Sequence, residues 1–123
     1  MAYGVIQFVE EGAPRATLVR TENGHPTGPD GLMDPLSALI ESVSPAILDE
    51  GSPGAARMAM LFFAREQEAG RGMRIVGAEG EWGITPREVD ALPGRGYYYE
   101  VSVGRAGERA VPHVLASGIE ASH

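Results

Sequence analysis

The stretch Tyr97-Tyr98-Tyr99-Glu100-Val101-Ser102-Val103 is the clearest strand pattern in the chain and decides for a fold built on a sheet. Its odd-numbered positions are all tyrosine or valine, and its even-numbered positions place tyrosine, glutamate and serine on the other face. Residues 3–10 alternate similarly, and a turn at 11–14 leads to a second strand around Leu18, which predicts an antiparallel hairpin. A turn at 104–107 leads to a further strand at 110–115, where Pro112 favours an edge position.

Three helix starts between these hairpins share one pattern. Asp34-Pro35, Ser52-Pro53 and Thr85-Pro86 each place a capping side chain before a proline. The first helix is expected to end at Ser44-Pro45, and the second to run over 53–69 with Gly70 as its C-terminal cap. The third start is a capping box, because Glu88 follows Thr85 by three residues.

The order of elements predicts an α+β fold. We expect an antiparallel sheet made of two hairpins plus a central strand at 73–76, with the two main helices packed on one face. Residues 1–116 would form a single domain, and residues 117–123 a frayed C-terminal tail.

Composition narrows the classes of function. The chain has 123 residues, no cysteine and a net charge of −7, and all ten of its basic residues are arginine. The lack of cysteine excludes thiolate nucleophiles and zinc–thiolate sites, and the acidic balance argues against direct binding of nucleic acid. We expect no membrane contact and a cytoplasmic location, since no apolar run approaches the length of a bilayer span and the start lacks a basic signal region.

The sequence does not predict a catalytic residue, a metal site or a cofactor. No Gly-x-Ser-x-Gly elbow and no histidine–carboxylate metal spacing occurs. A hydrolase that uses His25 with a nearby carboxylate remains an alternative, since Glu22, Asp30 and Asp34 are close to it in sequence.

A stiff, polar loop and an arginine–aromatic cluster point instead to ligand binding. The loop Asn23-Gly24-His25-Pro26-Thr27-Gly28-Pro29-Asp30-Gly31 separates the first hairpin from the first helix. Arginines that meet a phosphate while tryptophan or tyrosine stacks on a base would suit a small anionic ligand such as a nucleotide. The candidate contacts are His25, Arg71, Arg74, Trp82, Arg95 and Tyr98.

The chain resembles a group of small, uncharacterised bacteriophage and prophage proteins. Their loop has an Asp-Gly-Tyr-Pro-x-Gly-like core, for which this chain has Asn23-Gly24-His25-Pro26-Thr27-Gly28, and a late tyrosine-rich strand, here Tyr97-Tyr98-Tyr99-Glu100-Val101. The resemblance spans residues 4–103 and departs from the loop pattern at Asn23 and His25. It implies a phage setting, in which small acidic proteins often act by binding, and it supplies no catalytic residue. Together with the arginine–aromatic cluster, that setting leads us to expect a non-catalytic protein of the host cytoplasm that sequesters a nucleotide-like signal of host defence.

An acidic inhibitor of a host protein is the alternative function. It would present carboxylates to its partner in a protein–protein interface. We also expect the protein to form a homo-oligomer. The candidate surface consists of Glu10, Glu11, Glu22, Asp49, Glu50, Glu79 and Glu81.

Overall fold

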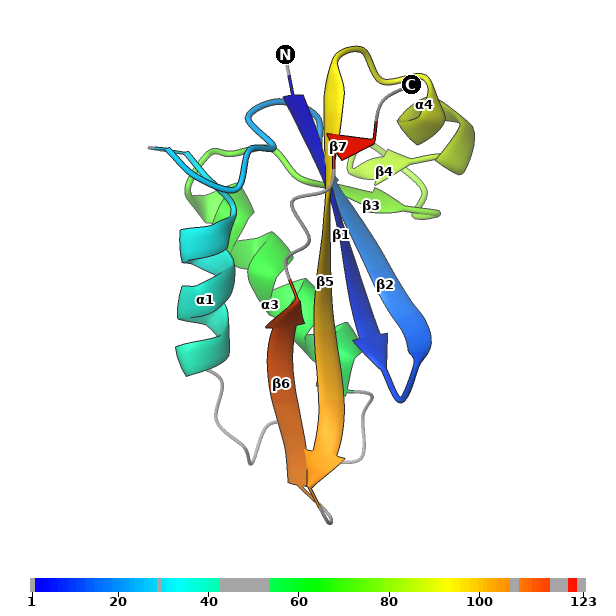
Figure 1. Cartoon of the computed structure of the whole chain (residues 1–123). Coiled ribbons are helices and arrows are strands. Elements are labelled where there is room, and N and C mark those ends of the chain that lie inside the picture. Colours follow the sequence, from blue (N-terminus) through cyan, green and yellow to red (C-terminus); the bar gives the residue numbers. More distant parts are fainter. Residues whose placement is uncertain (1, 29, 43–53, 107–108, 116–119, 122–123) are drawn as a thin grey trace.

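In the computed structural model, the protein consists of a mixed β-sheet with helices on both of its faces (Figure 1). The structure describes residues 2–28, 30–42, 54–106, 109–115 and 120–121. The strands are β1 (Ala2–Glu10), β2 (Ala13–Arg20), β3 (Arg74–Val76), β4 (Gly83–Ile84), β5 (Arg95–Ala106), β6 (Arg109–Leu115) and β7 (Glu120–Ala121). The helices are α1 (Met33–Ser42), α3 (Gly54–Glu68) and α4 (Pro86–Asp90).

The strand order is β4-β3-β2-β1-β5-β6, and β7 pairs with β5 outside this path. β1 and β2 form an antiparallel hairpin, as do β5 and β6. The two hairpins meet at the centre of the sheet, where β1 runs parallel to β5 from the pair Ala2–Arg95 to the pair Glu10–Val103. β7 lies within the expected tail 117–123 and pairs with β5 at Gly96 and Tyr97.

The prediction of an antiparallel sheet is wrong. β1 and β5 are parallel, β3 and β4 are parallel, and β3 lies between β2 and β4 rather than at the centre. Alternation along a strand fixes which side chains share a face, but it does not determine which distant strand pairs with it or in which direction. The fold remains α+β only in the broad sense, with a mixed sheet.

Two hydrophobic clusters lie on opposite faces of the sheet. The larger cluster joins Ile6 and Phe8 of β1 to Leu36 of α1 and to Met58 and Phe62 of α3. The smaller cluster combines Tyr3, Val5, Val19 and Ile84, with Val89 and Leu92 packed against it. Figure 1 accordingly shows α1 and α3 on one side of the sheet and α4 on the other.

The helix-start predictions have mixed outcomes. The capping box is confirmed, because Thr85 Oγ1 accepts from Glu88 N at 3.1 Å and Glu88 Oε1 accepts from Thr85 N at 3.2 Å. The N-cap at Asp34 is wrong, since α1 already begins at Met33. Both Ser52-Pro53 and Ser44-Pro45 lie outside the described residues.

Candidate functional site

The loop of residues 23–31 is anchored on the sheet through Gly24. Gly24 N donates to Ala2 O at 3.2 Å, and the buried Tyr99 hydroxyl donates to Gly24 O at 2.6 Å. A Cβ at position 24 would lie 2.1 Å from the carbonyl carbon of Tyr3, so only glycine allows this approach to β1. The Gly24 end of the loop is therefore a fixed part of the scaffold.

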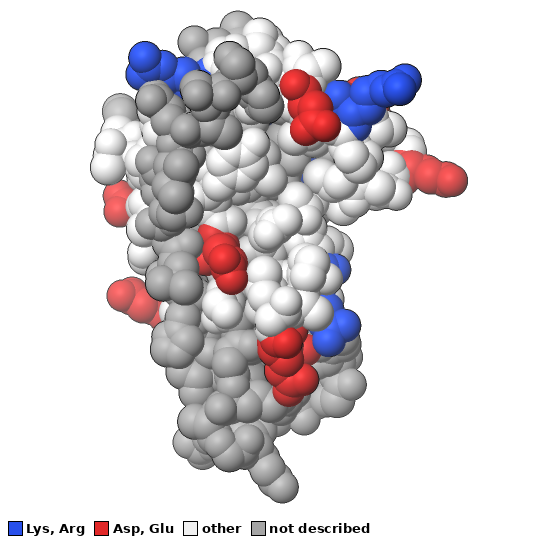
Figure 2. All heavy atoms as spheres, turned by 45° about the vertical axis from the view of Figure 1, so that its right-hand side comes forward, with Lys and Arg blue, Asp and Glu red and all other residues white. Residues whose placement is uncertain are grey.

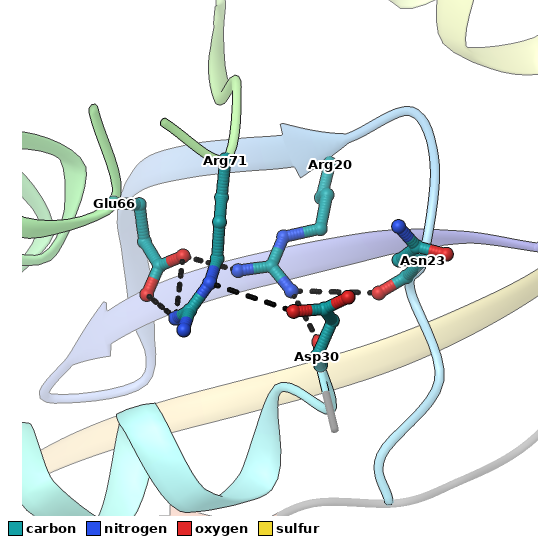
Figure 3. A network of polar contacts seen from close by, with 5 residues as sticks. All are labelled: Arg20, Asn23, Asp30, Glu66 and Arg71. Atoms are coloured by element: carbon teal, nitrogen blue, oxygen red, sulfur yellow. Dashed lines mark hydrogen bonds and ion pairs between the residues drawn. The ribbon is translucent and has the colours of Figure 1, made fainter. Parts of the chain in front are cut away.

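Arg20, the last residue of β2, connects the two ends of this loop to helix α3. Its Nη1 donates to Asp30 O at 2.7 Å and to Asn23 O at 3.4 Å, and its Nη2 donates to Glu66 Oε2 (Figure 3). The Arg20 and Glu66 side chains are each only 3% exposed. One guanidinium thus holds β2, the loop and α3 together at a single point.

Arg71 reaches the same carboxylate through the way α3 ends. Gly70 has a φ of +74°, Gly70 N donates to Gln67 O, and Arg71 N donates to Glu66 O at 3.0 Å, which is a Schellman motif. The predicted glycine cap is confirmed. The motif folds Arg71 back beside Glu66, where Arg71 Nη1 lies 3.4 Å from Glu66 Oε1, and Arg71 Nε lies 3.9 Å from Asp30 Oδ1.

The electrostatics of the two arginines differ because their burial differs. Burial lowers the pKa of Arg20; the charge of Glu66 opposes that shift, and the charge of Arg71 adds to it. Arg20 Nε is buried and has no hydrogen-bond partner among the described residues. Arg71 is 36% exposed, so its guanidinium faces solvent on one side. Arg20 is therefore structural, and of these two arginines only Arg71 is substantially exposed to solvent.

A polar hollow of about 480 Å³ opens beside these groups. We call it the Arg71 hollow, and its lining includes Arg20, Glu22, Asn23, Asp30, Gly70 and Arg71. Its volume falls in the range of about 300–1,000 Å³ that is typical of small-molecule sites. Among the described residues that line it, none is aromatic.

No family model, curated protein or solved structure matches this chain. The resemblance to phage proteins therefore stays a prediction, and so does the homo-oligomer. Within the described residues, no helix is long and apolar enough to cross a membrane, and no group of three or more histidine and carboxylate side chains is arranged to hold a metal ion.

The predicted ligand contacts do not converge on one pocket. Of the six candidate contacts, only Arg71 lines the Arg71 hollow. Arg74 and Trp82 line a neighbouring hollow of about 260 Å³, and Gly72 borders both hollows. Arg74 Nη1 donates to Glu81 O, and Trp82 is 53% exposed with its ring edge-on to Phe63 at 6.3 Å between centroids.

The other three candidates lie elsewhere. His25 is exposed, and its ring centroid is 5.2 Å from that of Tyr97. Tyr98 packs against the smaller hydrophobic cluster, where burial and a hydrogen bond with Tyr98 raise the pKa of Tyr3. Arg95 is exposed at the start of β5.

The sequence analysis did not single out Arg20 and Glu66, and it considered Asp30 only as a carboxylate close to His25. The signal for Arg20 is strand alternation, because Arg20 follows the buried Leu18 by two positions and so faces the same side of β2. The signal for Glu66 is helical spacing, because it continues the buried stripe of Ala59 and Phe62. Two opposite charges on inward faces of adjacent elements indicate a buried ion pair.

Not all of the carboxylates predicted for the acidic inhibitor surface are described as surface groups. Glu10 is 5% exposed, and its carboxylate accepts from Gly54 N at 2.7 Å, so it is not a surface group. Asp49 and Glu50 lie outside the described residues. On the face in Figure 2, carboxylates stand in small separate groups, some of them beside arginines.

Proposed function

We propose that the protein is a non-catalytic binding protein that holds a small ligand through an anionic group in the Arg71 hollow. The observation that supports this most directly is the state of the Arg71 guanidinium. Its Nη1 makes only long contacts with Glu66, of 3.4 and 3.5 Å, and the described residues give its Nη2 no hydrogen-bond partner. An arginine in this state can offer a pair of N–H donors to a carboxylate or phosphate.

The surroundings of Arg71 favour binding because they are already ordered. The Schellman motif fixes the backbone of Arg71, and the Arg20–Glu66 pair fixes the carboxylate on which the Arg71 side chain rests. A ligand would therefore not have to order the loop or the end of α3 on binding, which preserves affinity. His25, on which the hydrolase alternative depends, is not among the described residues that line the hollow.

The ligand is anionic, as the sequence predicts, but we no longer expect an aromatic side chain to stack on a base. Trp82 belongs to the neighbouring hollow, and Tyr98 packs against the opposite face of the sheet. The phosphate-plus-base arrangement that a nucleotide needs is thus divided between two hollows that share only Gly72 among their described lining residues. A simple carboxylate or phosphate at Arg71 needs no such second element.

A titration followed by amide and arginine Nε–H resonances in NMR spectra tests the proposal. The probes are propionate, inorganic phosphate, adenosine monophosphate, L-alanine and L-glutamine at millimolar concentration. We expect at least one probe to shift the resonances of Asp30, Gly70 and Arg71 in a saturable way. Arg71→Ala should abolish the shifts, and Arg87→Ala, which removes an exposed arginine on α4, should leave them unchanged. Absence of saturable shifts with every probe would overturn the proposal.

A further inference from the structure

The charges that a ligand meets in the Arg71 hollow are of both signs. Arg20 and Glu66 are buried against each other and present no free charge. The accessible charges are those of Arg71, at 36% exposure, and of Asp30, at 57%, together with the exposed Glu22. One positive and two negative groups therefore face the ligand, and a phosphate that carries two negative charges would be repelled by two carboxylates.

The end of helix α3 adds to the negative side of this balance. Gly70 and Ala69 line the hollow directly after the last turn of this 15-residue helix. The C-terminal end of a helix carries partial negative charge, which favours a cationic group near it. The same wall that offers Arg71 to an anion is thus also favourable to a cation.

The spacing of the opposite charges narrows the ligand further. Arg71 Nε and Asp30 Oδ1 are 3.9 Å apart and come from different segments of the chain, as Figure 3 shows. That distance is too long for a hydrogen bond, and an exposed contact of this kind is weak, so a ligand can insert its own groups at little cost. The ligand that fits has a carboxylate and an ammonium group on neighbouring atoms.

We propose, building on the binding function above, that the Arg71 hollow takes a zwitterion of the α-amino acid type. The ligand carboxylate accepts hydrogen bonds from the Arg71 guanidinium, and its ammonium group donates to the Asp30 carboxylate. Glu22 and the end of α3 add attraction for the ammonium group, and the remainder of the hollow receives the ligand side chain.

An isosteric series of probes tests this assignment by calorimetry and by the Arg71 Nε–H resonance. L-Alanine carries both charges, propionate lacks the ammonium group, and ethylamine lacks the carboxylate; L-glutamine and adenosine monophosphate complete the series. We expect L-alanine or L-glutamine to bind about 10-fold or more tightly than propionate and ethylamine, as removal of one charge-assisted hydrogen bond implies. Asp30→Asn should lower that preference while propionate binding stays equal or becomes tighter.

The outcomes separate this inference from the binding function itself. If propionate or adenosine monophosphate binds as tightly as the amino acids and Arg71→Ala abolishes that binding, the zwitterion assignment is wrong and the anion-binding function stands. If no probe binds, both are wrong. Equal affinity of the wild-type protein and Asp30→Asn for L-alanine and L-glutamine would also overturn the assignment.

Discussion

Arg20 and Glu66 lie 46 positions apart in the sequence and form an ion pair whose two side chains are each 3% exposed. The pair lies where β2, the 23–31 loop and α3 meet, and it positions Arg71 through the second oxygen of the same carboxylate. A buried ion pair adds little stability compared with a hydrophobic pair of similar size. Removal of one partner is strongly destabilising, because the other charge is then buried alone.

Glu66→Ala is expected to lower the free energy of unfolding by about 3–5 kcal/mol, because it leaves the Arg20 charge buried without its partner. That loss is a large part of the total of about 5–15 kcal/mol typical of a single domain. Urea denaturation followed by circular dichroism measures it.

Two further variants act as controls for this prediction. Arg71→Ala removes a half-exposed partner of the same carboxylate and should cost no more than about 1 kcal/mol. The double variant Arg20→Met/Glu66→Leu should recover part of the loss, because neither charge is then left alone. A double variant no more stable than Glu66→Ala would contradict this account.

Local patterns in the sequence predicted the local structure well. The alternation of residues 97–103 placed Tyr99 and Val101 in the larger cluster and Tyr98 on the opposite face, and the structure confirms this. The capping box at Thr85 and the glycine cap at Gly70 were also readable, since each motif is completed within a few residues.

Long-range pairing was not readable from these patterns. The parallel neighbours β1 and β5 are separated by the whole helical middle of the chain, and nothing in either strand specifies the other. The same limit applies to the site. Arg71 was a candidate because arginine suits anions, but its partners Glu66 and Asp30 become neighbours only through the Schellman motif and the anchored loop.

Gly24→Ala is expected to destabilise the protein by about 3 kcal/mol or more, since overpacking here is against backbone atoms that cannot rotate away. The new Cβ would lie 2.1 Å from Tyr3 C and 2.2 Å from Gly4 N. Thermal and urea unfolding measure the loss. Gly72→Ala, whose Cβ would meet nothing within 4 Å, should stay within about 0.5 kcal/mol of wild type. Equal effects of the two substitutions would show that the loop is not held as described.

Thr85→Ala is expected to cost about 1 kcal/mol by removing the side-chain acceptor of the first turn of α4. The effect should be local, because α4 is five residues long and rests on the smaller cluster through Val89. Hydrogen exchange at the Glu88 amide, which donates to Thr85 Oγ1, should accelerate. Thr85→Ser keeps the hydroxyl and should preserve the protection; unchanged Glu88 exchange in Thr85→Ala would refute the prediction.

Stability is expected to fall in alkaline solution because of Tyr99. Burial raises the pKa of the Tyr99 phenol, the neighbouring Tyr97 adds to the shift, and Arg20 opposes it. In the unfolded chain the phenol ionises near pH 10. Its contribution to the free energy of unfolding is therefore fully present below that pH and is lost as pH rises further, by up to about 1.4 kcal/mol for each pH unit.

Tyr99→Phe should cost about 1–3 kcal/mol near pH 8, since Gly24 O loses its buried donor, and it should make the decline in stability above pH 10 shallower. The pKa of Tyr3 is also raised by burial, so the stability of the double variant Tyr3→Phe/Tyr99→Phe should decline even less with pH. Urea unfolding at a series of pH values between 8 and 11 measures these slopes, and parallel curves for wild type and Tyr99→Phe would rule out this role for the buried phenol.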